Sequence, residues 1–400
     1  MKKILWLLLL CLGSVALAGE IQIDCDFPGG NILVDSIKDG VVRVRPDQRG
    51  STMNWFYYAF RVRNAQGQTL RFVFDQPNRV GSRGPAISTD NEKTWRYLSD
   101  KPEFHSQEFT YTFGPEEKEV KFAQAILYTQ KNWDAFIAAY REKPTVRLST
   151  LCRTRKGRDV ELLRFGNENG KFGMALTCRH HCCEMTASFV LEGILEEAFS
   201  DTEAGRWLRE NVAFYVVPFV DKDGVEDGDQ GKGRAPHDHN RDYNHELYPE
   251  IKALKQGILE AFGEKKLFFQ DLHCPWIRSG MNEYLYSPMS DQAKMSQAAG
   301  VYFKMLETIQ KDGEIPYVEA NNLPFGQGWN NAANFRKMEN GVLTSSAKMW
   351  VGTLPNTIYA GTLEMPYSNS SGVEVTRENS RELGRNMAKA MAEFLKTQGE

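Results

Sequence analysis

Residues 178–184 read Cys-Arg-His-His-Cys-Cys-Glu, and they join an apolar run at 173–178 to an amphipathic run at 185–199. The first run is short and apolar, which is typical of a buried strand, and the second has the apolar spacing of a helix. A strand followed by a helix is the repeating unit of α/β domains. The stretch therefore predicts an α/β fold with histidines and a carboxylate at a strand end.

The second half of the chain repeats this alternation. The predicted strands are 161–165, 173–178, 212–220, 266–272 and 357–365, and the predicted helices are 185–199, 245–262, 292–311 and 376–396. We expect a mixed, mostly parallel sheet with helices on both faces. The composition changes beside Pro144, so we place this second domain at 143–400.

The chain before that boundary has the pattern of a different domain. Short runs of alternating apolar residues lie at 32–44, 54–62, 70–74 and 109–122, separated by turn residues. The runs at 54–62 and 70–74 flank Gly67, which favours a hairpin. We predict an all-β sandwich domain at 19–142 that ends in a helix at 128–141.

The first eighteen residues have the pattern of a secretory signal peptide. Lys2 and Lys3 precede an apolar segment at 4–12, and Ala-Leu-Ala at 16–18 fits a cleavage site. We therefore expect an exported protein, periplasmic or secreted, without stable membrane insertion after cleavage of the signal. The composition, with 49 basic and 52 acidic residues, argues against nucleic acid as a partner.

Three residues have the types and positions of zinc ligands. His181 and Glu184 are three apart just after a strand, and His273 follows the predicted strand at 266–272. Two imidazoles and one carboxylate leave a fourth position open, which a hydrolytic zinc requires. Each residue alone also fits an ordinary surface or strand-end role, so only the set of three indicates a metal site.

Further polar residues lie where a catalytic site needs them. Glu364 is a carboxylate inside an apolar strand pattern, where an unpartnered charge is costly, although an edge strand facing water would also explain it. Asp238-His-Asn-Arg241 follows a long loop. Arg241 can bind a carboxylate with two parallel hydrogen bonds, and Asn240 adds a donor, although an ordinary surface pair is the alternative.

The ordered set resembles the zinc metallocarboxypeptidase family. That family has His-x-x-Glu, then Asn-Arg, then a strand-end His, then a Glu on a late strand, and this chain has His181-Cys-Cys-Glu184, Asn240-Arg241, His273 and Glu364. Within the family the chain is most similar to the cytosolic-carboxypeptidase branch, which has a β-sandwich before the catalytic domain. Supporting similarities lie at 54–57, 184–193 and 217–225.

The resemblance implies a role for each matching position. His181, Glu184 and His273 would hold one Zn²⁺ ion, and Glu364 would be the general base for a zinc-activated water. Asn240 and Arg241 would bind the terminal carboxylate of the substrate.

Two further assignments follow from the same resemblance. Asp238 would orient His181 by a hydrogen bond to its other ring nitrogen. Arg234 is the candidate for the arginine that stabilises the oxyanion, although its spacing to Asn240 is shorter than in the family.

The chain departs from the family between the first two ligands. The family usually has Pro-Gly there, whereas this chain has Cys182-Cys183. The sequence allows three states for these cysteines: buried thiols, a disulfide with Cys152, Cys178 or Cys274, or competing zinc ligands. We favour thiols or a disulfide. The family's late tyrosine has no counterpart at matching spacing before Glu364, and we expect Tyr359 to pack within its strand.

The predicted function is that of an exported zinc-dependent carboxypeptidase acting on peptide or protein C-termini. One alternative is a carboxypeptidase or amidase for cell-wall peptides, and another is a binding protein with a vestigial metal site. Arg336, Lys337 and Lys348 precede Glu364 and would suit a pocket for acidic side chains, although solvated surface residues are the commoner explanation.

Overall fold

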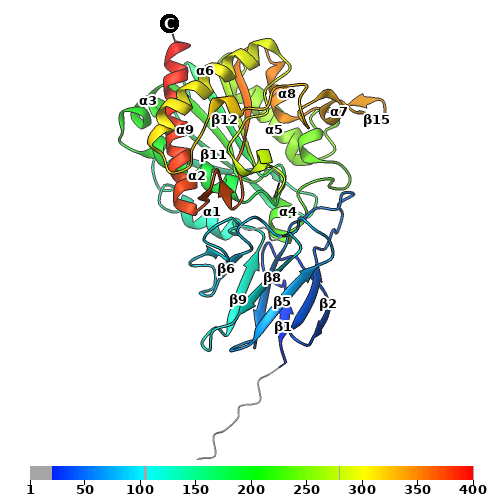
Figure 1. Ribbon diagram of the computed structural model, residues 1–400. Helices are drawn as coiled ribbons and strands as arrows, with labels where there is room; N and C mark the ends of the chain where they lie inside the picture. The colour runs from blue at the N-terminus through cyan, green and yellow to red at the C-terminus, as the bar shows by residue number, and fades with distance from the viewer. Residues whose placement is uncertain (1–19, 103–105, 279, 400) are drawn as a thin grey trace, which may run out of the picture.

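The computed structural model describes residues 20–102, 106–278 and 280–399. A β-rich part formed by the first third of the chain lies against a larger α/β part formed by the rest (Figure 1). The predicted signal peptide at 1–18 lies outside the described residues. In the described ranges, no helix combines the length and the apolar composition that a bilayer-spanning helix needs.

The β-rich part consists of two sheets packed face to face. One sheet has, in order, β1 (Gln22–Asp24), β4 (Ala59–Arg63), β9 (Glu119–Ala123), β6 (Ala86–Ser88) and β7 (Arg96–Tyr97). The other has β2 (Leu33–Lys38), β3 (Val41–Arg45), β5 (Thr69–Phe74) and β8 (Glu108–Thr112). Buried phenylalanines from both sheets fill the space between them. The prediction of a β-sandwich is confirmed.

The predicted hairpin between 54–62 and 70–74 is wrong. β4 pairs with β1 and β9, whereas β5 pairs with β3 in parallel and with β8 in the opposite sheet. The turn between β4 and β5, with Asn64 at φ 62° and Gly67 at φ 72°, carries the chain across the sandwich. Both strands bury alternate residues in the same core, so their patterns are compatible with either arrangement.

The α/β part is built on a six-stranded sheet. Its order is β10 (Arg147–Arg153), β11 (Asp159–Gly166), β13 (Val212–Val217), β12 (Phe172–Cys178), β14 (Lys266–His273) and β17 (Thr357–Glu364). The last four strands of this order are parallel to one another. β11 runs antiparallel both to its neighbour β13 and to the edge strand β10. The predicted mixed, mostly parallel sheet is therefore confirmed, with β10 as a mostly exposed strand that its sequence pattern did not reveal.

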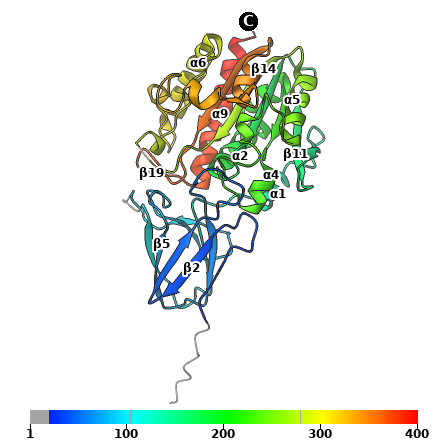
Figure 2. The ribbon, with the colours of Figure 1, turned by 90° about the vertical axis from the view of Figure 1, so that its right-hand side faces the viewer.

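Helices cover both faces of this sheet. α2 (Thr186–Phe199), α3 (Glu203–Asn211), α6 (Ala293–Ile309) and α9 (Arg377–Thr397) pack on one face, and α5 (Pro249–Phe262) and α8 (Ala347–Gly352) pack on the other. Figure 2 shows α5 on one side of the sheet and α6 on the other. Each face thus buries its own apolar cluster, which explains why the strands are apolar on both sides.

The start of α5 differs from the prediction of a helix from residue 245. The helix begins at Pro249, a residue that favours the first turn. Before it, the backbone N–H groups of Leu247 and Tyr248 donate to the side chain of Asp242 at 3.1 and 2.9 Å. These bonds hold a turn in which Glu246 has φ 53° and Tyr248, the residue before Pro249, is extended, so the helix does not extend over them.

Short elements complete the described chain. They are α1 (Gln130–Ile137), α4 (Lys222–Asp227), α7 (Ala332–Phe335), η1 (His239–Arg241), η2 (Gly280–Glu283), η3 (Gln310–Asp312), η4 (Glu319–Asn321), β15 (Met338–Glu339), β16 (Val342–Leu343), β18 (Asn369–Ser370) and β19 (Val373–Glu374). α1 buries Trp133 and Ile137 in the larger of the two apolar clusters beside the six-stranded sheet. The domain boundary at 142 and 143 stays a prediction.

Polar and aromatic contacts join the two parts. The Gln230 side chain accepts from the N–H of Tyr57 and donates to its carbonyl, both at 2.9 Å. The Trp55 ring meets the Trp276 ring edge to face, with centroids 4.5 Å apart. The first domain is therefore in direct contact with the loop that follows β14.

Candidate active site

The candidate site lies at the carboxyl ends of three parallel strands. His181 and Glu184 follow β12, His273 ends β14, and Glu364 ends β17. β12 has β13 on one side and β14 on the other. Along the chain, β12 is followed by β13 on one side and then by β14 on the opposite side, so the strand order reverses at β12. Binding crevices of α/β sheets form at such a point. His273 and Glu364 are direct partners in the register of β14 and β17.

The two histidines face the same carboxylate. His181 Nδ1 lies 2.7 Å from one oxygen of Glu184, and His273 Nδ1 lies 2.7 Å from the other. The three side chains are buried, and their ligand atoms lie within 4.8 Å of one another. Burial alone would raise the pKa of Glu184, but the two histidines hold it down at about 2. The carboxylate therefore stays charged.

The opposite ring nitrogens have partners of their own. His181 Nε2 lies 3.3 Å from Asp238 Oδ1, and His273 Nε2 lies 2.6 Å from Asp271 Oδ2. Each Nε2–H can donate to its carboxylate, which leaves the lone pair of Nδ1 directed at Glu184. When both rings are neutral, these lone pairs repel the carboxylate unless a cation lies between them; without a metal ion, a proton on each Nδ1 takes that place and lowers the pKa of Glu184. This donor set therefore fits a zinc ion.

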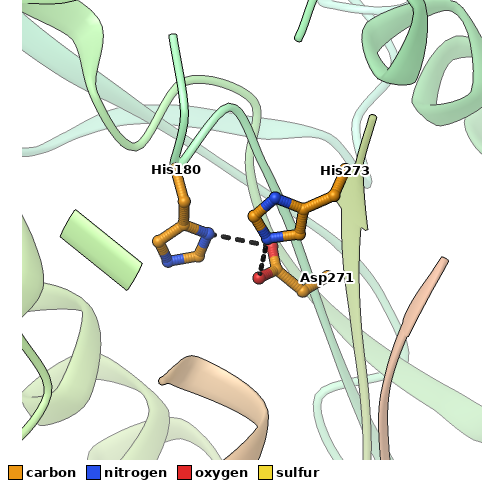
Figure 3. Close-up of side chains that lie close together, drawn as sticks. All are labelled: His180, Asp271 and His273. Carbon is orange, nitrogen blue, oxygen red and sulfur yellow. Dashed lines mark hydrogen bonds and ion pairs between the residues drawn. The ribbon is translucent and has the colours of Figure 1, made fainter. Parts of the chain in front are cut away.

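Asp271 is the centre of a second buried arrangement, which Figure 3 shows with His180 and His273. His180 Nδ1 donates to Asp271 Oδ1 at 2.9 Å, and the hydroxyl of Thr177 donates to the same oxygen at 2.8 Å. The Tyr243 hydroxyl lies 2.8 Å from His180 Nε2. Asp271 thus holds His273 and is itself held by two donors, a role that the sequence analysis did not assign to it.

Glu364 is buried beside the three candidate ligands. Its side chain receives no hydrogen bond from the described residues, and burial raises the pKa of its carboxyl to about 7. The charge of His273 lowers the pKa of Glu364, and the negative charge of Glu184 raises it. A carboxyl that titrates near neutral pH suits a group that must accept and return a proton.

These residues open into a cavity of about 330 Å³. Its lining includes the three candidate ligands, Glu364, and residues of both domains. Met53 and Trp55 come from the β-sandwich, and Trp329 and Phe335 come from the segment around α7. The cavity is therefore lined by aromatic side chains from both domains as well as by the charged residues.

Asn240 and Arg241, for which the sequence predicts carboxylate binding, both line this cavity. Arg241 Nε donates to the carbonyl of Asn334 at 3.0 Å, and the guanidinium lies over the Phe335 ring, 4.4 Å from its centroid. Asn240 Oδ1 accepts from the N–H of Ala347 at 2.9 Å. These contacts fix the orientation of both side chains.

The structure does not bring Arg234 to the cavity. Its Nε donates to Asp221 at 2.9 Å, and a second guanidinium nitrogen donates to Asp229. Arg234 is not among the described residues that line the cavity. Lys232 lies there instead, with its Nζ 3.2 Å from Asp238 Oδ2. The sequence spacing offered no means of choosing between these two residues of one loop.

Of the three cations that precede Glu364, only Lys348 is a described lining residue. Burial lowers its pKa to about 8, against the effect of the nearby Glu364 carboxylate. Arg336 is paired with Asp291 and half exposed. Tyr286, which the sequence analysis did not single out, also lines the cavity, whereas Tyr359 is buried and bonded to Gln270.

The six described cysteines are free thiols. Cys182 Sγ donates to the carbonyl of Asp229 at 3.1 Å, and burial raises the pKa of Cys183 to about 12. Neither belongs to a potential metal-binding group of the described residues. The pair that replaces Pro-Gly is therefore packed in the core as neutral thiols.

Comparison with known families gives two matches. Residues 134–274 match the family described as zinc carboxypeptidase, and residues 23–124 match the cytosolic carboxypeptidase N-terminal domain. Glu364 lies beyond both matched segments. The order of the two matched domains agrees with the fold.

Curated relatives support the same grouping. Cytosolic carboxypeptidase 6 of Mus musculus is 23% identical over 94% of this chain and 73% of its own length. Cytosolic carboxypeptidase 3 of Mus musculus is 24% identical over 65% of this chain, but the chain spans 29% of that protein.

Solved structures share the fold. A metallo-carboxypeptidase from Burkholderia cenocepacia superposes with a TM-score of 0.75 at 20% identity, over 94% of this chain and 99% of its own. A metallo-carboxypeptidase from Pseudomonas aeruginosa, solved with (2-guanidinoethylmercapto)succinic acid, has a TM-score of 0.72 at 20% identity, with the same coverage.

The predicted export is contradicted by these comparisons. The curated relatives are named cytosolic carboxypeptidases, and the first domain matches the N-terminal domain of that group. The prediction of a periplasmic or secreted protein is therefore wrong, and the alternative of a cell-wall peptidase, which depended on export, loses its basis.

Proposed function

This chain is a metallocarboxypeptidase of the zinc carboxypeptidase family, and from that premise we propose that it removes C-terminal residues from peptides or proteins by the residues described above. The observation that carries the proposal is the buried set of His181, Glu184 and His273 beside Glu364. Two imidazoles and one carboxylate suit one zinc ion with a position left for substrate or water.

His181, Glu184 and His273 would hold one Zn²⁺, which when bound supplies Lewis-acid activation of water and of the scissile carbonyl. Asp238 and Asp271 keep the two histidines in the tautomer that directs Nδ1 inward. The chain itself therefore fixes the direction in which each imidazole presents its lone pair.

The substrate's terminal carboxylate would bind Arg241, with Asn240 as a second donor. The guanidinium is already held by Asn334 and Phe335, so little side-chain freedom is lost on binding. This contact would orient the last peptide bond toward Glu364. Binding by the terminal carboxylate restricts the reaction to the end of a chain.

Glu364 would accept a proton from the attacking water and deliver it to the leaving amine. Its carboxyl, with a pKa raised by burial, can hold the proton between these two transfers. We assign the stabilisation of negative charge on the carbonyl oxygen to Lys232 in place of Arg234, because Lys232 lines the cavity and Arg234 is occupied by two aspartates.

The test compares Glu364→Gln with the wild-type protein on a library of peptides, with mass spectrometry of the products. The variant is expected to keep one zinc ion per active site and to lose hydrolysis by about a hundredfold or more. His181→Ala is expected to lose both. Normal cleavage by Glu364→Gln would contradict the assignment, and zinc binding without any hydrolysis by the wild-type protein would favour a binding protein.

A further inference from the structure

A second group of metal-ligand side chains lies outside the site described above. His237, Asp242 and His245 can each offer one ligand atom, and these atoms all lie within 4.8 Å of one another. We propose that these three residues form a second metal site, for a borderline divalent cation such as Zn²⁺. The site lies where the loop after β13 meets the β15–β16 hairpin. The label β15 shows the position of this hairpin in Figure 1.

The spacing of the two imidazoles is that of the first site. The ring centroids of His237 and His245 are 4.8 Å apart with planes at 40°, and those of His181 and His273 are 4.8 Å apart with planes at 57°. Two imidazoles that share one ion bring their centroids to about this distance, because each nitrogen lies about 2 Å from the metal. The pair is therefore spaced for a common ligand.

Glu339 fixes the orientation of both rings. Its carboxylate lies 2.7 Å from His237 Nε2, and its backbone carbonyl accepts from His245 Nε2 at 3.1 Å. A proton on each Nε2 leaves the lone pair on Nδ1. The same division holds at the first site, where Asp238 and Asp271 hold the Nε2 atoms and the Nδ1 atoms face the carboxylate.

Asp242 supplies the carboxylate of the second group. It is fully buried, and the backbone N–H groups of Leu247 and Tyr248 hold its two oxygens in place. Among the described residues its ion-pair partner is His237, whose Nδ1 lies 3.6 Å away. If His237 is neutral, this buried charge lacks a cation, which a metal ion would supply.

A doubly protonated His237 is the competing explanation. It would pair with Glu339 on one side and with Asp242 and the Asp238 carbonyl, at 3.2 Å, on the other. That state does not account for His245 Nδ1, which is buried and has no hydrogen-bond partner among the residues that the structure describes. A metal ion accounts for both histidines and for the aspartate at once.

The second site would brace the substrate-binding segment. His237 and His245 flank the residues Asp238, Asn240 and Arg241 in the sequence, and Glu339 belongs to the hairpin that follows α7. α7 also holds Arg241, because the carbonyl of Asn334 accepts from its guanidinium. A metal at this point would therefore stabilise the position of the segment that carries Arg241 relative to the hairpin that follows α7.

The experiment counts zinc in the full chain. Metal-free protein is incubated with excess zinc sulfate, passed through gel filtration, and analysed for zinc per chain by plasma mass spectrometry. The wild-type protein is expected to hold two ions. His245→Ala and His181→Ala are each expected to hold one, and the double variant none. Asn244→Ala is the matched control and should keep two, because Asn244 is next to His245 but exposed, and its side chain donates to the Leu343 carbonyl.

Two results would overturn the second site. One is a wild-type protein with one ion and a His181→Ala variant with none, which does not depend on the folding of His245→Ala. The other is a folded His245→Ala variant that keeps the wild-type count. Failure of the proposed function is distinguishable, because it would show as a zinc count that His181→Ala does not lower.

Discussion

Glu364 makes the stability of the metal-free protein depend on pH. Its pKa of about 7 in the folded chain lies above its ordinary value of 4.5, so the folded state binds the proton more tightly than the unfolded state. The stability that this proton provides is present below pH 4.5 and is lost as the pH rises to about 7. Glu364→Gln removes that loss.

In the presence of a chelator, Glu364→Gln is expected to raise the free energy of unfolding at pH 8 by about 3 kcal/mol, since each pKa unit corresponds to about 1.4 kcal/mol. The gain should shrink as the pH falls toward 5. Urea unfolding at both pH values measures it. A gain of equal size at both would mean that ionisation of Glu364 is not its cause.

Arg241 is expected to determine the requirement for a free terminal carboxylate. Charge-assisted hydrogen bonds to a carboxylate contribute about 1.5–3 kcal/mol, so Arg241→Ala should raise KM by about 10- to 100-fold for peptides with a free C-terminus. Peptides with an amidated C-terminus, cleaved slowly by the wild-type protein, should be little affected. Steady-state kinetics on both substrates gives the answer, and equal losses on both would refute the contact.

The residues of the site differ in how far the sequence could reveal them. His181, Glu184, His273 and Glu364 lie at the ends of parallel neighbouring strands, so the strand pattern indicated one edge of the sheet, and the order of the family's motifs identified the four residues as one set. Arg234 could not be judged in this way. Its place depends on Asp221 and Asp229, which bind it across the loop, and no periodic pattern encodes that contact.

At the level of elements, the crossing of α2 and α9 depends on glycine. A Cβ added at Gly193 would lie 2.0 Å from the backbone carbonyl oxygen of Arg381, so alanine there must push the two helices apart. Gly193→Ala is expected to lower the free energy of unfolding by about 1–3 kcal/mol, as overpacking of a core does. Because α2 follows Glu184 directly, zinc affinity should fall as well.

Gly300 in α6 is the matched control for this helix substitution. A Cβ there would have no atom within 4 Å, so Gly300→Ala should raise the free energy of unfolding by about 0.5–1 kcal/mol through helix propensity. Urea denaturation of the two variants is the measurement. If both glycines responded alike, close packing of α2 on α9 would not be the cause.

Element boundaries were predictable where hydrophobic spacing is regular and not where a side chain intervenes. α2, α6 and α9 begin and end within two residues of their predicted positions. α5 starts later, because Asp242 accepts the N–H groups of Leu247 and Tyr248 in a turn where Glu246 has a positive φ and Tyr248, before Pro249, is extended. The pairing of β4 and β5 was mistaken because the sequence pattern gives the buried face of a strand and not its neighbour.

At the scale of the whole molecule, the first domain forms part of the cavity. Trp55 lines it and packs against Trp276 of the second domain. Trp55→Ala is expected to lower kcat/KM about tenfold, because an aromatic wall that orients the substrate is removed, with zinc content unchanged. Peptide hydrolysis and metal analysis measure the two properties.

The control for this substitution is Ile37→Ala in the same domain. Ile37 is exposed on β2 and is not a described lining residue of the cavity, so its loss should leave kcat/KM unchanged. An equal loss for both variants would mean that the first domain acts through general stability.

The position of β17 has a consequence for protein synthesis. β17 is the last strand of the six-stranded sheet along the chain, it carries Glu364, and α9, which packs against α2, comes after it. On the ribosome, His181 and Glu184 emerge long before Glu364, and domains fold as units once their chain is available. A nascent chain therefore lacks the proposed proton acceptor until β17 has been synthesised, and we expect hydrolysis only after that point.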